Sequence, residues 1–562
     1  MAAVEETVYE AEAAAIAEAS NDLIGPMPVE KETLWHKIDH LLYLPILNLT
    51  RPRDLYYYQG AGLQALYGFT YKYLTVEHFL GKLTRLNIGD ALADKLANVY
   101  AQSQYPGAEP LTIFTDWHVK PHWTKERSHS GHVTMWGRTM PGTKQLVVNG
   151  PDGYWLGCWN YQIDSHMTQV LVELEERLCQ TLQRPILCNI FDSEGGGLPT
   201  GEAYAAAGGH YLSILSRQHN YPLSSFVMAG EWQTVIDDNS REAVYAQWRH
   251  EDKAAADPRQ FVLLRPIGQT EPTRIYTGLL PENLPAAVVP WCHRQRWPHN
   301  EQRIRDMING ANLNENYGYT YDEAPHRTRQ RQWEAAQAQV EVIENKLLQA
   351  REAVKNLRQK QREAHETHAR QRTLLQTEMG QQRLKIAQGQ REGKAVKQRQ
   401  QGLRQRRKEL QQRENSLQKK LRRLHQKTVE QQHRIAALQL QLTQRQQKRD
   451  AIDTETLCRQ RHLEKDQIML NWQVLLTNLH EWAKQNVFAP AWQKLSLAKA
   501  TELIYRKSGY VRWHPDHIEV VLDSYRYREH QRAMEMTCQR FNQANLHWRD
   551  GRLLRFSVQE PP

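Results

Sequence analysis

Three short stretches of the sequence each bring a carboxylate to a place where it could do chemistry. The apolar run LTIF leads to Asp116, the run PILCNIF leads to Asp192, and RQRWPHNE opens a predicted helix that carries Glu301. Because ligands bind outside the carboxyl ends of strands in α/β sheets, we expect the aspartates at strand ends and the helix packed across them. Three converging carboxylates repel one another unless cations hold them. Hard oxygen ligands suit Mg²⁺ or Mn²⁺, and two such ions can bind both reacting oxygens of a phosphodiester.

The segment that must position these residues reads as a mixed α/β sheet over residues 106–325. Strands are predicted at 111–116, 132–138, 144–150 with 153–159, 185–192 and 210–216. Helices are predicted at 166–182 and 201–209, the first with an apolar face of Met167, Val170, Leu171, Leu174 and Leu178. Three antiparallel strands, extended by parallel strands with crossover helices, account for this order.

A second β-rich block, residues 221–290, lies between the last of these strands and the helix that carries Glu301. We interpret it as an insertion that could form a small β-subdomain. Other acids compete with the three candidates. Asp164 is better explained as a cap or turn residue before the first helix, and Asp237 with Asp238 stands beside Asn-Ser, a turn signature.

The basic charge of the chain is concentrated in one segment. The formal net charge is +10, yet residues 326–450 alone hold 31 Lys and Arg against 12 Asp and Glu. Apolar residues repeat there at heptad spacing, from Val340 to Leu357 and again from Leu403 to Leu442, which predicts a coiled coil over 326–455. Gly380, Gly389 and Gly393 separate the two halves, so a helical hairpin is preferred over one interrupted rod. Its charge could bind the DNA backbone or could cover a dimerisation arm.

The remaining segments are predicted to be an acidic disordered tail (1–32), a helical N-terminal domain (33–105) and an α+β C-terminal region (456–562). The N-terminal helices could include a helix-turn-helix or could serve packing and dimerisation. Six scattered cysteines with no CxxC pair argue against a zinc site or a disulfide framework. With neither a basic signal-peptide head nor a membrane-length apolar run, we expect a soluble cytoplasmic protein without membrane contact.

The strand order, the two aspartates and the RW-x-x-x-E helix resemble the RNase H-like core of the DDE transposases of bacterial insertion sequences. The matching residues are Asp116 in FTDWHVKPHW, Asp192 in NIFDSEGG and Glu301 in RQRWPHNEQRIRDM. The run MINGANLNENYGY and the closing LLRFSV are similar to the same group, and an inserted β-block is found in its cut-and-paste members. The resemblance covers residues 34–325 and the last hundred.

This resemblance implies a two-metal phosphoryl transfer with two Mg²⁺ or Mn²⁺ ions, in which Asp116, Asp192 and Glu301 are both catalytic and metal-binding. Its partners would be double-stranded DNA, as terminal repeats and as target, and a second subunit, in the bacterial cytoplasm at the nucleoid. The tyrosine that commonly precedes RW is missing, and no lysine stands one to two helical turns after Glu301, where Arg303 and Arg305 lie. Six residues are candidate phosphate contacts: His118, Lys120, Arg294, Arg296, Arg303 and Arg305.

Two alternatives remain open from the sequence. One is a catalytically inactive, domesticated transposase that acts as a DNA-binding or architectural coiled-coil protein. The other is a metal-dependent nuclease that performs no strand transfer.

Overall fold

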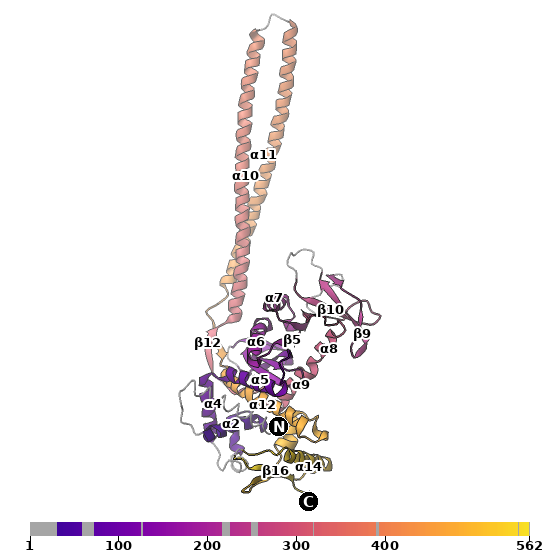
Figure 1. Ribbon diagram of the computed structural model, residues 1–562. Helices are drawn as coiled ribbons and strands as arrows, with labels where there is room; N and C mark the ends of the chain where they lie inside the picture. The colour runs from indigo at the N-terminus through magenta and orange to yellow at the C-terminus, as the bar shows by residue number, and fades with distance from the viewer. Residues whose placement is uncertain are drawn as a thin grey trace. The chain divides into compact units, whose positions relative to one another are not determined.

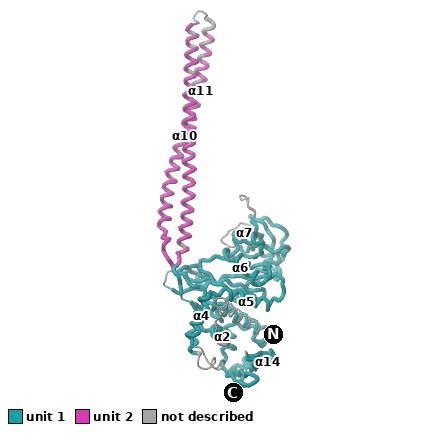
Figure 2. Tube along the Cα trace, turned by 60° about the vertical axis from the view of Figure 1, so that its left-hand side comes forward, with its two compact units in different colours: residues 1–323, 459–562 teal, residues 324–458 magenta. Residues whose placement is uncertain are grey.

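The computed structural model describes residues 31–58, 72–124, 128–215, 225–248, 257–318, 320–388, 393–548 and 550–560. The chain forms two compact units, one built from residues 1–323 and 459–562 and the other from residues 324–458 (Figure 2). Most of the expected acidic tail, residues 1–30, lies outside the described residues.

The first unit is centred on a mixed sheet. Its first six strands are β1 (Leu111–Pro121), β2 (Ser130–Val133), β3 (Arg138–Asn149), β4 (Trp155–Gln162), β5 (Ile186–Phe191) and β6 (Tyr211–Ile214). β1 and β4 both pair with β3 in antiparallel fashion, whereas β5 runs parallel to β1 and β6 runs parallel to β5. The predicted arrangement of antiparallel strands extended by parallel ones is therefore confirmed.

The two helices predicted between these strands are α6 (Met167–Leu182) and α7 (Leu198–Ala207). On α6, Met167, Leu171, Leu174 and Leu178 are buried, and they join a core that contains β1 and β3 residues such as Ile113. This is the face that the helical periodicity predicted.

The block expected as an insertion continues the same sheet instead of forming a subdomain of its own. Its strands are β7 (Phe226–Met228), β8 (Gln233–Val235), β9 (Asp238–Trp248), β10 (Gln260–Pro266) and β11 (Arg274–Leu279). β11 pairs antiparallel with β6, with Tyr276 opposite Ile214. The edge of β6 thereby gains a hydrogen-bonded neighbour, which satisfies backbone groups that an edge strand leaves unpaired.

The N-terminal helices and the first C-terminal helix share one apolar core. They are α2 (Lys31–Ile46), the 3₁₀ turn η1 (Pro52–Tyr58), α4 (Tyr73–Leu86), α5 (Gly89–Gln104) and α12 (Glu464–Asn486). α5 contacts β4, α6 and α12, and its buried residues run from Gly89 to Ala101. Because it is covered on these sides, α5 does not present the exposed face that a recognition helix needs for the major groove.

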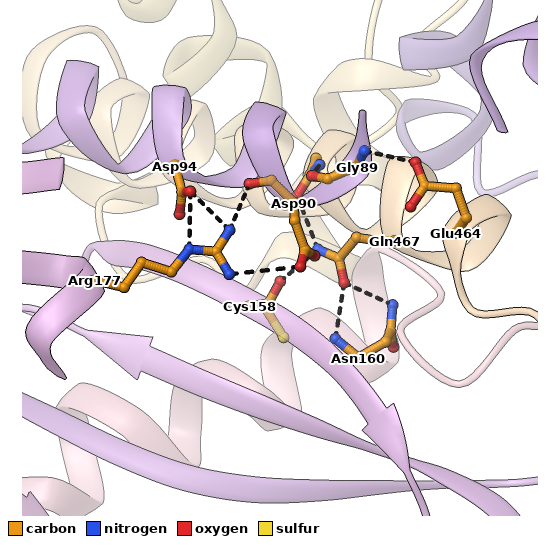
Figure 3. A network of polar contacts seen from close by, with 9 residues as sticks. Gly89, Asp90, Asp94, Cys158, Asn160, Arg177, Glu464 and Gln467 are labelled. Carbon is orange, nitrogen blue, oxygen red and sulfur yellow. Dashed lines mark hydrogen bonds and ion pairs between the residues drawn. The ribbon is translucent and has the colours of Figure 1, made fainter. Parts of the chain in front are cut away.

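Polar side chains bind α12 to the rest of this core (Figure 3). Gln467 accepts a hydrogen bond from the Asn160 backbone at 2.8 Å and donates to the Cys158 carbonyl at 2.8 Å. Glu464 accepts from the backbone N–H of Gly89 at 2.6 Å. A Cβ atom at Gly89 would lie 2.8 Å from Gln467 Cγ, so the close approach of α5 and α12 requires glycine at this position.

The rest of the C-terminal segment packs beside α12 in a smaller apolar cluster. Its elements are η6 (Pro490–Trp492), α13 (Leu497–Ala500), the π turn η7 (Thr501–Tyr505), β14 (Gly509–Trp513), β15 (His517–Leu522), α14 (Arg528–Gln543) and β16 (Leu553–Val558). β14 and β15 form the predicted antiparallel pair, and the closing strand β16 adds parallel to β15. These residues belong to the first unit and not to a separate C-terminal body.

The second unit contains two long helices, α10 (Arg327–Gln388) and α11 (Gly393–Asp450), that lie side by side (Figure 1). Gln361 donates to Thr428 at 3.4 Å, and Arg445 donates to Gln339 at 2.6 Å. The paired residues are 67 positions apart in the first bond and 106 in the second, as expected when two helices run antiparallel away from a connecting turn. The antiparallel hairpin was the preferred prediction. Residues 389–392, between the helices, lie outside the described residues.

The short strands β12 (Tyr321–Pro325) and β13 (Leu457–Arg461) pair where the chain enters and leaves the hairpin segment. Across the described residues, no helix combines the length and the apolarity that crossing a bilayer requires.

Candidate active site

The register of two parallel strands places two of the predicted acids next to each other. Thr115 of β1 is the partner of Phe191 at the end of β5, and the next residue on each chain is Asp116 and Asp192. β1 does not end at Asp116, as expected from the apolar run, but continues to Pro121. Asp116 therefore lies in the middle of a strand, where its antiparallel partner is Val147 of β3. Asp116 and Asp192 are still neighbours, because Asp192 directly follows the end of β5 at the level where β1 continues through Asp116.

Glu301 comes from a helical segment that follows β11. This segment consists of α8 (Val289–Arg294), the π-helical turn η5 (Trp297–Glu301) and α9 (Gln302–Gly310). Asn300 is buried and donates to the Phe114 carbonyl at 3.0 Å and to Asn149 Oδ1 at 3.1 Å. These two bonds fix the π turn against β1 and β3, so the next residue, Glu301, is held beside Asp116. Turns of this kind are frequent at functional sites.

Arg296 binds the three acids together. One terminal nitrogen of its guanidinium lies 2.6 Å from Asp116 Oδ2, and the other lies 3.8 Å from Asp192 Oδ1 and also pairs with Glu301. The Arg296 side chain is only 10 % exposed. A residue that we expected to contact DNA phosphate is thus the counter-ion of the acidic cluster in this structure.

The electrostatics of the cluster are those of a site that needs positive charge. The pKa of Asp116 is raised to about 7, chiefly by burial and also by the carboxylates of Asp192 and Glu301, against the lowering effect of the Arg296 guanidinium. The backbone N–H of Trp117 also donates to Asp116 Oδ1 at 2.8 Å. Mutual repulsion among three carboxylates is costly, and a cation at their centre relieves it.

The donor set suits a divalent cation, although the present arrangement is organised around Arg296. Asp116, Asp192 and Glu301 offer the carboxylate oxygens that Mg²⁺ and Mn²⁺ prefer. The guanidinium is a stand-in for positive charge at the point where they meet. As the described side chains stand, no group of three His, Cys, Asp or Glu residues has the geometry to hold a metal ion. A metal bound here would compete with Arg296 for the same oxygens.

Two predicted phosphate contacts on β1 are buried and already have partners inside the protein. His118 Nε2 lies 2.6 Å from Asn314 Oδ1, and burial lowers the pKa of the imidazole to about 4. Lys120 donates to the Glu315 carbonyl at 2.8 Å and pairs with Asp466 of α12 at 3.5 Å. Both side chains serve the packing of α12 and the 313–317 segment onto β1, and neither presents its charge to a phosphate in this structure.

The arginines on either side of the π turn are placed differently from one another. Arg294 is 40 % exposed and pairs with Asp238 at 3.6 Å. Arg303 is 17 % exposed and forms an ion pair with Glu481 of α12, which ties α9 to the C-terminal helix. Arg294 remains accessible to a ligand, whereas Arg303 is used within the fold.

Arg305 and Trp297 are both exposed on this segment. The Arg305 guanidinium lies over the Trp297 ring, 5.7 Å from its centroid, and Trp297 is 49 % exposed. Trp297 directly follows Arg296. A cation stacked on an exposed aromatic ring can hold a base and a phosphate.

The rival acids lie outside the cluster, as predicted. Asp164 pairs with His129 at 3.5 Å in the turn before α6. Asp237 adopts a left-handed φ of 59° in the turn between β8 and β9, and Asp238 pairs with Arg241.

Two comparisons with known proteins were negative. No family model matches the chain. No curated protein matches it significantly either. The functional conclusion therefore depends on the site itself.

Sequence reasoning missed two residues that build this site. It assigned Arg296 to DNA and did not notice Asn300. The only sequence signal for either was their position in RQRWPHNE, five residues before Glu301 for Arg296 and one residue before it for Asn300, because the π turn that brings them inward has no distinctive composition.

Proposed function

We propose that the protein is a DDE-type transposase that cleaves DNA at the ends of a mobile element and joins those ends to target DNA. The observation that carries this proposal is the meeting of Asp116, Asp192 and Glu301 around one guanidinium. The three acids come from two adjacent parallel strands and a helix that returns to them across the sheet. Three carboxylates around one guanidinium leave the cluster short of positive charge, which favours a set of acids that binds further cations.

The strand order supports the same proposal. The strands β4, β3, β1, β5 and β6 lie in that order, with the first three antiparallel and the last two parallel to β1. This is the order expected of an RNase H-like core, in which the first two acids belong to neighbouring central strands. The strands β7 to β11 would then be the insertion of a cut-and-paste member, built onto the edge of the core.

In this proposal Asp116, Asp192 and Glu301 hold two Mg²⁺ or Mn²⁺ ions, which supply Lewis acidity and lower the pKa of the attacking water or hydroxyl. The side chains of the chain itself perform the positioning. Asn300 sets Glu301 against β1, and the Ser213 hydroxyl, which donates to the Asp192 carbonyl at 2.8 Å, fixes the end of β5. Trp297, Arg305 and Arg294 are the accessible groups for DNA beside the acids.

The alternative of an architectural protein is favoured by one specific observation. Arg296 neutralises the acidic cluster from within the chain, as it would if a former metal site had become a structural ion-pair network. In that case the basic hairpin helices would carry the DNA-binding function.

The deciding experiment uses a supercoiled plasmid that carries the DNA flanking the coding sequence, with Mg²⁺ or Mn²⁺, and compares the wild type with Asp116→Ala and Asp192→Ala. We expect metal-dependent cleavage at the element ends and strand transfer, both lost in either variant. Asp516→Asn, an 84 % exposed acid between β14 and β15 and outside the cluster, is the matched control and should keep full activity.

Each other outcome selects a different function. Cleavage without strand transfer would identify a nuclease. Equal inactivity of the wild type and both variants, with salt-sensitive DNA binding retained, would favour the architectural protein and contradict the transposase.

A further inference from the structure

One stripe of residues along α10 changes the sign of its charge halfway. Residues three and four positions apart share a face of a helix, and this spacing links two sets. The acidic half of the stripe consists of Glu334, Gln337, Glu341 and Glu344. The basic half consists of Arg351, Lys355, Arg358 and Arg362. Leu348 lies between the halves at the same spacing and is 58 % exposed.

Within its own hairpin the stripe bonds through Gln337, which accepts from Arg449 of α11 at 2.8 Å and donates to Glu341 at 3.0 Å. Its charged members are all exposed, and in the described part of the chain no ion pair joins any of them to another residue. It runs beside the buried seam of the hairpin, which on α10 includes Val340, Leu347 and Val354. Charges on such flanking positions of a coiled coil commonly select the partner and its orientation.

The two halves are mirror images about Leu348. Glu341 and Lys355 lie seven residues on either side of it, or ~10.5 Å, and Glu334 and Arg362 lie fourteen residues on either side, or ~21 Å. Glu344 and Arg351 lie four and three residues away. A second identical stripe, turned end for end about Leu348, therefore places each acid opposite a base.

The surface beside the basic half of the stripe contains a hollow. A hollow of about 550 Å³ is lined there by the four cations of the basic half together with Val354, Gln359 and Ile435. No acidic side chain lines it. The acidic half of another copy would bring the opposite charge to this hollow.

We propose that the stripe is the interface with a second copy of this chain, whose hairpin lies antiparallel across it on a two-fold axis at Leu348. Such an interface is self-complementary, so each ion pair occurs twice. The stripe spans ~42 Å, and a contact one hairpin wide along that length buries roughly 800 Å² per partner, as standard specific interfaces do.

Duplex DNA fits the stripe less well than a second copy. DNA would be attracted by the basic half, but its phosphates would be repelled by the acidic half, which is as long and is spaced to match. The mirror symmetry has no role in binding a uniform polyanion, whereas it is required by a two-fold protein interface.

Charge reversal in the full chain tests the proposal by sedimentation velocity at low salt. Variant A carries Arg351→Glu, Lys355→Glu, Arg358→Glu and Arg362→Glu, and variant B carries Glu334→Lys, Glu341→Lys and Glu344→Lys. We expect each variant alone to dissociate with a constant raised about tenfold or more, because like charges then face each other. An equimolar mixture of A and B should form a heterodimer, since one stripe is wholly acidic and the other wholly basic.

The matched control reverses Lys346 and Lys360, two exposed cations of α10 that lie outside the stripe, and it should leave the mass unchanged. Far-ultraviolet circular dichroism verifies that the helices of A and B are intact. A wild type that is monomeric up to ~0.1 mM, far above the Kd expected of an interface this size, would overturn the proposal. So would a mixture of A and B that does not associate. A monomeric wild type whose DNA affinity falls in variant A would assign the basic half to DNA instead.

Discussion

The replacement Arg296→Gln tests whether the guanidinium and a divalent cation occupy the same position. The guanidinium contacts Asp116 at 2.6 Å, pairs with Glu301 and lies 3.8 Å from Asp192. Removing one partner from a buried ion pair costs about 3–5 kcal/mol. Asp192 is 49 % exposed and can regain water, so we expect a loss of about 2–3 kcal/mol in the free energy of unfolding without divalent metal.

The second half of this prediction concerns metal. Without Arg296 the three carboxylates lose the cation that they share, and Mn²⁺ or Mg²⁺ should bind more tightly to the variant than to the wild type. A ligand at one hundred times its Kd stabilises the folded state by about 2.7 kcal/mol, which would offset the loss. The measurement is thermal unfolding of both proteins in EDTA and over a Mn²⁺ titration.

Arg294→Gln is the control, because Arg294 lies two residues away and pairs with Asp238, outside the cluster. Arg294→Gln should leave the melting temperature in EDTA, and its increase with Mn²⁺, close to those of the wild type. The reasoning is refuted if Arg296→Gln is as stable as the wild type in EDTA and shows no greater stabilisation by Mn²⁺.

Two further predictions concern the interior of the first unit. Lys120→Met should destabilise the fold by about 1–3 kcal/mol in urea unfolding, because buried Asp466 loses the ammonium 3.5 Å away while it keeps the Arg461 guanidinium at 3.7 Å. The double variant Lys120→Met with Asp466→Asn keeps an oxygen acceptor for the N–H groups of Tyr317 and Gly318. It should recover part of that loss, while recovery of none would contradict a buried-pair role. Burial raises the pKa of Glu175 to about 7, beyond the lowering effect of hydrogen bonds from Tyr204 and Asn189. Since this folded-state pKa exceeds the unfolded value near 4.5, protonation of Glu175 favours the folded state. The contribution of the protonated carboxyl to the free energy of unfolding is fully present below pH 4.5 and is lost as the pH rises through 7. Glu175→Gln should therefore be more stable than the wild type by about 3 kcal/mol at pH 8, with the difference vanishing at pH 4.5, and a difference that does not depend on pH would contradict this assignment.

Much of the sheet could be predicted from the sequence because its signals are local. The run PILCNIF is apolar over the length of a buried strand, and α6 has a helical repeat of apolar residues from Met167 to Leu178. Strand order then followed from general rules on connections. Asp116 and Asp192 were found in the same way, since each follows an apolar run.

The parts that were not predicted depend on contacts between distant segments. His118 and Lys120 looked accessible because nothing near them in sequence indicates that α12 and residues 313–317 cover them. α12 itself buries Gln467, Asn471 and Asn478, polar residues that a rule based on hydropathy places at the surface. Only the hydrogen bonds they form with β4 and α5 make that burial favourable.

The continuation of β11 onto β6 was missed for a similar reason. Residues 221–290 have ordinary strand patterns that would suit either a separate subdomain or an extended sheet. Whether these strands form a separate subdomain or extend the sheet depends on whether the edge of β6 is free to pair with β11. A single sequence does not reveal which strand edge is free.

The separation of the first unit into residues 1–323 and 459–562 has a consequence for the order of events during synthesis. β4 and α5 emerge from the ribosome more than 300 residues before the α12 residues that bond to them, Gln467 to β4 and Glu464 to Gly89 of α5. At ~5–20 residues per second, the sheet that holds Asp116 and Asp192 waits on the order of 15–60 s for the helix that completes its core. During that interval the hairpin helices can already form, since their contacts lie within one continuous segment. The acidic centre thus belongs to a unit whose apolar core is completed only when nearly the whole chain has been made.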